Sequence, residues 1–409
     1  MFYYRPYFVH RGTFDAGESD VQYCMAAQRE RRNHSRMRRS RRPCPAKSGD
    51  MMAALPTLSA AVHVTMESAP RSPSQPVYPQ CVQGVTCIQL IPYSHRSLIF
   101  DCAAVNTSQR VNGNVYFMHG NDGPRSKGMY ALMMQAVAAH GYNVLACDQR
   151  GFSPRASPYN ESEYNYDLLV DDIFAIVDRY FGAGGKFHVV AHDQGARVAW
   201  HALAGSMARS RFASYTSLSI PHLDAFSTMM YGSNPEPKQQ LQYAYVRMLT
   251  LPNSVKAYNN NIWNHICQGA YGYETPEACQ PAMWWYNGAY AAGAIALQPF
   301  TGFGPIGKEI GIPETYVKDH SPYSLAGFPQ RSKIGNITEL PVQYICGVGE
   351  VADLCNDRAR DETAKYVAKF TYKRMSECGH CLTDPGLCPQ YQDVIDAVVE
   401  HIEAADAGH

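Results

Sequence analysis

The stretch Val189-Val190-Ala191-His192-Asp193-Gln194-Gly195-Ala196 decides the fold of this chain. It begins as an apolar run typical of a buried strand and continues into a run that favours a helix. A sharp turn between the two needs small residues where the backbone passes closely, and Ala191 and Gly195 lie two residues before and after Asp193. We expect a strand, a tight turn and a helix, with the Asp193 side chain raised above the end of the strand.

A carboxylate at this position has a distinctive chemistry. It can attack an sp3 carbon without a base to deprotonate it, and water can then cleave the resulting alkyl ester. It is a poor nucleophile for making an acyl-enzyme from an ester or a peptide. The alternative is that Asp193 only caps the following helix. We favour the nucleophile.

Similar strand-like runs recur on both sides of this stretch, each ending in a polar residue, glycine or proline. They cover residues 115–118, 142–147, 187–191, 215–220 and 342–346, and helical patterns cover 130–140, 166–180 and 196–204. The alternation predicts an α/β fold: a mostly parallel sheet with helices on both faces.

Composition divides the chain into four parts. Residues 1–80 contain an Arg-rich run and a Pro- and Ser-rich segment, so we expect a disordered or targeting extension. Residues 81–222 and 337–409 form the two parts of the α/β core. Residues 223–336 are rich in Tyr, Trp, Asn and Gly and lack clear strands, which predicts a helical cap inserted after the sixth strand.

From residue 87 onward the chain resembles the epoxide hydrolase and haloalkane dehalogenase branch of the α/β-hydrolase superfamily, which uses an Asp nucleophile. The resemblance rests on five landmarks in order: His119-Gly120, the run from Asp148 to Ser153, the turn at Asp193, the run from Ser219 to His222, and Gly379-His380. It implies the α/β-hydrolase fold.

The resemblance also implies partners for Asp193. His380 would activate the water that cleaves the ester. An acid would orient His380, and Glu350 fits the position best, with Asp353 as the alternative and Asp224 as a more distant candidate.

The oxyanion hole would be formed by the backbone N–H groups of Asn121 and Gln194. The sequence after Gly120 departs from the family, which often has an aromatic residue and Pro there, whereas this chain has Asn121-Asp122-Gly123-Pro124 and a longer loop.

The leaving group separates two chemistries. An epoxide opens to an alkoxide that needs a proton donor, and epoxide hydrolases resemble one another in two cap tyrosines, matched here by Tyr245 and Tyr286. Haloalkane dehalogenases place Trp and Asn where this chain has Gln194 and Asn121. We therefore expect an epoxide to be opened to a vicinal diol, with a haloalkane or haloacid dehalogenase as one alternative and a non-catalytic ligand-binding protein as another.

Bulk properties constrain the partners. The chain has 36 basic and 36 acidic residues and is 45% hydrophobic, which predicts no attraction to nucleic acid and favours a small, apolar to amphipathic organic substrate. No apolar run is long enough for an integral membrane segment. We expect no cofactor.

The 13 cysteines leave the compartment open, with the cytoplasm slightly favoured over a secreted or organellar location. Cys147 and Cys346 are interpreted as small core residues. Three other sets could pair if the protein were secreted: Cys81 with Cys87, Cys267 with Cys279, and the group Cys378, Cys381 and Cys388. We do not expect a metal at Cys378 and Cys381 despite their spacing, and the oligomeric state stays open.

Overall fold

A computed structural model describes most of the chain from residue 89 to residue 408. The described residues are 89–95, 97–107, 110–121, 126–243, 246–250, 254–257, 267–268, 273–291, 333–349 and 354–408. The N-terminal extension expected over residues 1–80, and the cap residues 292–332, lie outside this set.

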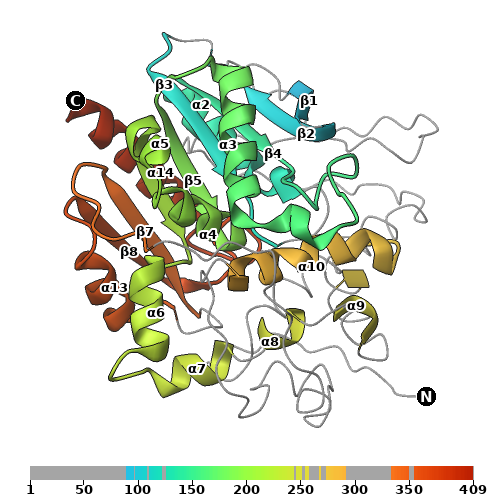
Figure 1. The fold of residues 1–409 in the computed structure, drawn as a ribbon. Coiled ribbons are helices and arrows are strands. Elements are labelled where there is room, and N and C mark those ends of the chain that lie inside the picture. Colours follow the sequence, from blue (N-terminus) through green and yellow to red (C-terminus); the bar gives the residue numbers. More distant parts are fainter. Residues whose placement is uncertain are drawn as a thin grey trace, which may run out of the picture.

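One eight-stranded sheet organises the core, in the order β1-β2-β4-β3-β5-β6-β7-β8 (Figure 1). Strands β1 and β2 pair antiparallel, as do β2 and β4, whereas the other neighbouring strands are parallel. The strands are β1 (Gln89–His95), β2 (Leu98–Val105), β3 (Gly113–Met118), β4 (Tyr142–Cys147), β5 (Phe187–His192), β6 (Phe212–Leu218), β7 (Val342–Gly349) and β8 (Phe370–Gly379).

Helices cover both faces of the sheet (Figure 1). On each face an apolar core lies between the sheet and its helices. On one face lie α3 (Tyr166–Phe181) and α4 (Asp193–Ala202), and on the other lie α2 (Ala131–Ala139) and α14 (Tyr391–Ala407). The remaining core elements are η2 (Ser126–Tyr130), η3 (Glu161–Tyr164), α5 (Ser206–Arg211) and α13 (Asp357–Ala364). The prediction of a mostly parallel sheet between helices is confirmed.

Between β6 and β7 the described chain is helical, where the cap is expected. It contains α6 (Leu223–Tyr231), α7 (Pro237–Tyr243), α8 (Val246–Leu249), α9 (Ser254–Ala257) and α10 (Pro276–Ala291). Helices α7 to α10 lie together beyond one end of the sheet (Figure 1). The exact boundaries of the four predicted parts stay a prediction.

The sequence patterns predicted where the central strands lie more accurately than they predicted the first and last residue of each strand. β4 has the predicted bounds, and β7 runs three residues beyond its predicted end at 346. The pattern did not single out β1, whose residues are mixed polar and apolar, or β2, whose apolar run is interrupted by Asp101. Helix α4 begins at Asp193, three residues before its predicted start at 196, because the turn joins strand and helix directly.

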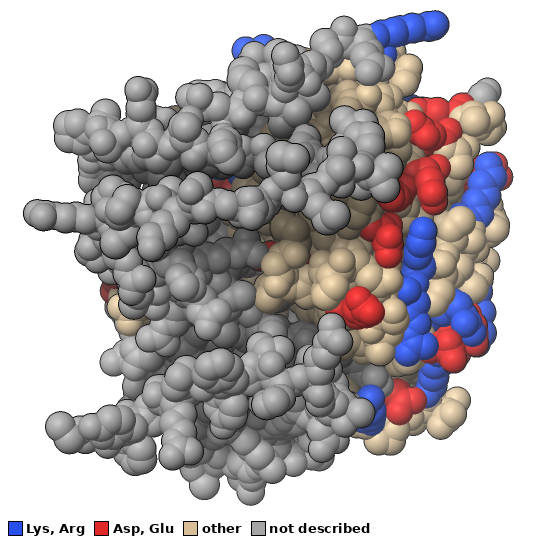
Figure 2. All heavy atoms as spheres, turned by 180° about the vertical axis from the view of Figure 1, so that it is seen from behind, with Lys and Arg blue, Asp and Glu red and all other residues tan. Residues whose placement is uncertain are grey.

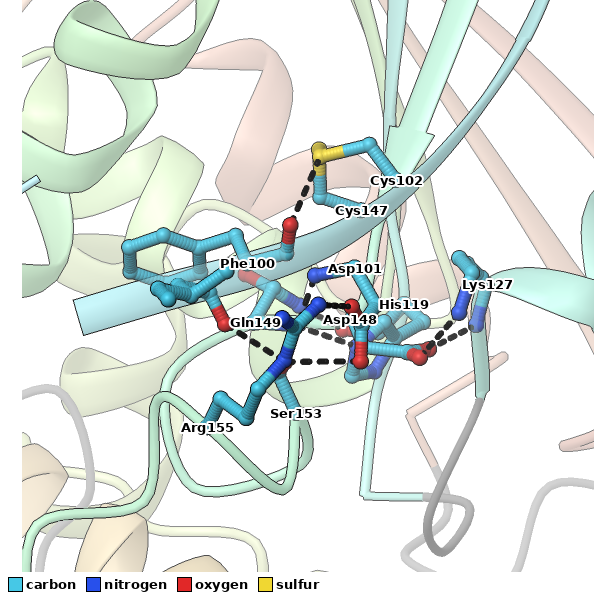
Figure 3. The surroundings of a disulfide bond; sticks show 11 residues. Phe100, Asp101, Cys102, His119, Lys127, Cys147, Asp148, Gln149, Ser153 and Arg155 are labelled. Atoms are coloured by element: carbon cyan, nitrogen blue, oxygen red, sulfur yellow. Dashed lines mark hydrogen bonds and ion pairs between the residues drawn. A yellow bond between two sulfur atoms is a disulfide. The ribbon is translucent and has the colours of Figure 1, made fainter. Parts of the chain in front are cut away.

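Four disulfides lie within the described part of the chain: Cys102–Cys147, Cys267–Cys279, Cys346–Cys355 and Cys378–Cys388. The interpretation of Cys147 and Cys346 as simple core residues was therefore wrong, although both are fully buried. Cys102 and Cys147 are register partners on the antiparallel strands β2 and β4, which brings their side chains together (Figure 3). This proximity depends on strand pairing, so spacing along the chain does not reveal it.

The described surface carries charges of both signs. On the face shown in Figure 2, basic and acidic side chains are interspersed over one side of the molecule. No helix among the described residues is long and apolar enough to cross a membrane.

We expect the four disulfides to form in the purified protein. Non-reducing peptide mapping should recover the peptide that contains Cys102 joined to the one that contains Cys147, and the other three pairs likewise. Loss of a buried disulfide typically costs about 2–5 kcal/mol, so reduction should lower the unfolding temperature. Alkylation of these cysteines in the unreduced, denatured protein would contradict the pairings.

Candidate active site

Asp193 lies on a sharp turn at the end of β5, where it is also the first residue of α4. Its φ is +46°, in the left-handed region that non-glycine residues rarely adopt. Two residues on, a Cβ at Gly195 would collide with the backbone oxygens of His119 and Met118 at the end of β3. The close passage expected from the sequence is present, and glycine is required there.

Parallel strands bring their carboxyl ends to one edge of the sheet, and the site is built on that edge. The backbone N–H of Asn121, just beyond β3, donates to Asp193 Oδ2 at 3.1 Å. His380, just beyond β8, places Nε2 at 3.7 Å from Asp193 Oδ1. The two side chains are 15% and 13% exposed, so the carboxylate and the imidazole face each other in a partly enclosed space.

The backbone of His380 is held by residues at the ends of β5 and β6. Its carbonyl oxygen accepts a hydrogen bond from His192 Nε2 at 2.8 Å and from Ser219 Oγ at 3.0 Å. Ser219 follows β6 with a φ of +68°, which makes it another residue in the left-handed region at this edge. These contacts fix His380 relative to the Asp193 turn.

Tyr286 reaches the site from cap helix α10 and is 5% exposed. Burial raises the pKa of Tyr286, and the nearby carboxylate of Asp193 raises it further, while interactions with the amides of Asn121 and Gln194 lower it. The hydroxyl is therefore protonated at neutral pH and lies near Asp193, as expected for a proton donor.

A packed contact between α10 and the core sets the position of Tyr286. The indole N–H of Trp285 donates to the backbone oxygen of Arg150 at 2.7 Å, and the amide of Asn287 donates to Glu161 at 2.7 Å. A Cβ at Gly288 would collide with the backbone oxygen of Tyr164. The helix is thus anchored on both sides of Tyr286.

Three buried residues beside the site were not predicted from the sequence. Tyr166, on α3, donates to the Gln194 side-chain oxygen at 3.2 Å. Arg197, one turn beyond Asp193, lies over the ring of Tyr243 at 5.4 Å. The charge of Asp193 and the nearby Tyr243 and Tyr286 add to the effect of burial in raising the pKa of Tyr166. Arg197 lies four residues after Asp193 on the same helix, and this spacing could have predicted its place beside the site. Tyr166 and Tyr243 come close to the site only through tertiary packing.

The other predicted residues have different outcomes. Glu350, Asp353 and Tyr245 lie outside the described residues. Asp224, at the start of α6, accepts a hydrogen bond from the backbone N–H of Gly335 at 2.8 Å. The Gln194 N–H, expected as an oxyanion donor, belongs to the first turn of α4 directly after Asp193. Among the described residues no cluster of three or more His, Cys, Asp or Glu side chains could hold a metal ion.

Comparisons with known proteins agree with this architecture. Residues 113–265 match the model of the alpha/beta hydrolase fold family. The chain is 41% identical to "Epoxide hydrolase B" of Mycobacterium tuberculosis over 87 residues, which cover 21% of this chain and 23% of that protein. It is 31% identical to "AB hydrolase superfamily protein YfhM" of Bacillus subtilis over 29% of this chain and 38% of that protein. These matches span well under half the length of either relative.

The fold likeness extends further than the sequence likeness. A solved structure from the work "Novel epoxide hydrolases belonging to the alpha/beta hydrolases superfamily in metagenomes from hot environments" superposes with a TM-score of 0.56 at 19% identity. The superposed region covers 79% of this chain and 100% of the chain in that structure. The chain therefore has the α/β-hydrolase fold.

Replacing Gly288 with alanine tests the anchoring of α10. Alanine favours a helix more than glycine does, but its Cβ would meet the Tyr164 backbone oxygen, so we expect a net loss of about 1–3 kcal/mol of stability. Thermal unfolding measures the change. Gly185→Ala is the control, because its Cβ would meet only a distant backbone oxygen at 3.8 Å. Equal unfolding temperatures for the two variants would contradict the contact.

Proposed function

We propose that this chain, which has the α/β-hydrolase fold, is a hydrolase that opens epoxides with water through an alkyl ester on Asp193. The observation that carries the proposal is the arrangement of the Asp193 carboxylate. Its Oδ2 accepts from the Asn121 N–H, while its Oδ1 faces the His380 imidazole. The likeness of short segments to epoxide hydrolases supports the same chemistry.

In the first step Oδ1 of Asp193 attacks one carbon of the epoxide, and the carbon–oxygen bond of the ring breaks. The oxygen that leaves as an alkoxide takes a proton, and Tyr286 is the donor we propose, because its protonated hydroxyl lies beside Asp193. Tyr245 is the second proposed donor on the basis of its sequence position. The product of this step is an ester with its carbonyl oxygen, Oδ2, facing the Asn121 N–H.

In the second step His380 removes a proton from water, and the water oxygen attacks the carbonyl carbon of the ester. Negative charge develops on Oδ2, where the Asn121 N–H already donates and where we propose that the Gln194 N–H adds a second hydrogen bond. The bond between that carbon and Oδ1 then breaks, and the departing oxygen takes the proton held by His380. The second proton of the water leaves the new carboxyl group and restores the hydroxyl of the tyrosine that donated in the first step. The diol carries away an oxygen that began on Asp193, and the water oxygen stays on the protein.

An acid must stabilise the imidazolium of His380, and we propose Glu350. The parallel register pairs Gly349 of β7 with Gly379 of β8, and Glu350 and His380 are the residues that follow these two glycines in the sequence. Asp353 is the alternative. Asp224 is less suited, because one of its carboxylate oxygens already accepts a hydrogen bond from the Gly335 backbone.

A dehalogenase is the second candidate, and the side chain of Asn121 favours it. This amide is 4% exposed; it interacts with the Tyr286 hydroxyl but makes no hydrogen bond of ordinary length and angle with the described residues. A buried amide N–H beside the nucleophile is suited to a halide ion.

Trapping of the ester tests the proposed enzyme against a non-catalytic binding protein. Rapid quenching with a labelled aryl epoxide should leave the label on the peptide that contains Asp193, and Asp193→Asn should abolish this adduct and lower turnover by more than about a thousandfold. A single turnover in H₂¹⁸O should place ¹⁸O on Asp193 rather than on the diol. Absence of an adduct with every epoxide and haloalkane in a broad panel would leave only the binding role.

The cap tyrosines separate the two leaving groups. Tyr245→Phe combined with Tyr286→Phe should lower epoxide turnover by about a hundredfold or more, because the alkoxide loses its proton donors. Halide release from a haloalkane should change little. Tyr180→Phe is the control, since it removes a hydroxyl at the opposite end of α3 from Tyr166. A double variant that still turns over epoxides at the wild-type rate would refute the assigned donors.

A further inference from the structure

The peptide unit between Gly120 and Asn121 is held at both of its polar groups. Its N–H, contributed by Asn121, donates to Asp193 Oδ2, and its carbonyl oxygen, contributed by Gly120, lies 2.7 Å from His119 Nδ1. Because a peptide unit is planar and rigid, a hydrogen bond at one end constrains the direction of the other. The His119 ring therefore influences where the Asn121 N–H points.

The neighbouring turn defines the proton positions on His119. The backbone N–H of Gln149 contacts His119 Nε2 at 2.9 Å and can only donate, so Nε2 is the acceptor. In a neutral imidazole the proton is then on Nδ1, which donates to the Gly120 oxygen. The Gln149 side chain also donates to the backbone oxygen of His119. His119 is fully buried, with its ring 4.8 Å from that of Phe152.

A second contact from the same turn fixes the start of η2, which is the next described element after Asn121. Lys127, in η2, forms an ion pair with Asp148 through its side chain and donates its backbone N–H to the other carboxylate oxygen at 2.9 Å. Figure 3 shows Asp148, Gln149, His119 and Lys127 gathered at the end of β4. Consecutive residues of one turn thus hold positions 119 and 127, on either side of Asn121.

The ion pair is difficult to explain as a device for stability. Both side chains are fully buried, and burial raises the pKa of Asp148 to about 6 although the ammonium of Lys127 lowers it. Desolvation therefore outweighs the attraction, and an apolar pair of similar volume is often as stable or more so. What the ion pair supplies is a defined position for η2 relative to β4.

We propose that Asp148 and Gln149 act as a clamp that orients the oxyanion-hole peptide, through the Nδ1–H tautomer of His119 at one end and through Lys127 at the other. His119, Lys127, Asp148 and Gln149 are positioning residues, since the Asn121 N–H makes the contact with Asp193. The inference rests on the proposed function for its effect on turnover but not for its geometry.

Two substitutions at His119 separate orientation from packing. His119→Asn keeps a donor where Nδ1 lies, whereas His119→Gln keeps an acceptor where Nε2 lies. With an aryl epoxide as probe, we expect kcat of the Asn variant within about tenfold of wild type and kcat of the Gln variant lower by about a hundredfold, with KM changed little. Equal kcat values for the two variants, or the reverse order, would overturn the role of His119.

The ion pair is tested by replacing both partners. Lys127→Met alone leaves a buried carboxylate and should lower both the unfolding temperature and kcat. Lys127→Met combined with Asp148→Leu should recover only part of the unfolding temperature, because the Lys127 backbone N–H loses its acceptor, while kcat stays about tenfold or more below wild type. Recovery of kcat together with the unfolding temperature would show that the pair only supports the fold and would overturn its part in the clamp.

An NMR measurement tests the clamp without turnover. Labelling with ¹³C-glycine and ¹⁵N-asparagine selects the Gly–Asn peptides that end at Asn114, Asn121 and Asn336, and Asn114→Asp and Asn336→Asp assign the other two. We expect the Asn121 amide proton downfield in wild type and His119→Asn, and shifted upfield in His119→Gln and in the double variant. Unchanged shifts would overturn the clamp even for an inactive protein, whereas changed shifts in a protein that turns over no epoxide would count against the proposed function alone.

Discussion

The site depends on one backbone constraint, the left-handed turn at Asp193. A non-glycine residue in this region costs about 1–2 kcal/mol, and the surrounding sheet maintains it. The turn can form only because Gly195 lets α4 pass against the end of β3. That same close passage brings the chain after β3 to Asp193, so that the Asn121 N–H reaches its carboxylate.

The parallel sheet then brings the other residues of the site to the same edge. Strands β3, β4, β5, β6 and β8 all end at the edge where Asp193 lies, and each contributes a residue to the site or to its support. His380 is held by the last residue of β5 and by the residue that follows β6, rather than by its own strand alone. A catalytic constellation assembled in this way is rigid because its members share the hydrogen bonds of one sheet.

The cap contributes a different kind of precision. Tyr286 lies on a helix that packs against the core through the indole of Trp285 and the close approach at Gly288. Burial and the charge of Asp193 raise the pKa of its hydroxyl, which is protonated at neutral pH even at the ordinary tyrosine pKa. For the proposed reaction, the choice of leaving group therefore depends on the contact between α10 and the core, where the Tyr286 hydroxyl suits an alkoxide and the Asn121 side chain suits a halide.

The sequence by itself determined the fold and the sharp turn at Asp193, because these depend on local patterns. Apolar runs that end in polar residues specify strands of a parallel sheet, and small residues on either side of Asp193 specify the turn. Tertiary structure alone decided which side chains meet. The pairing of Cys102 with Cys147 follows from strand register, and the partners of His119 and Lys127 come from the next strand's turn. Such contacts join residues distant in the chain, and no periodicity in the sequence encodes them.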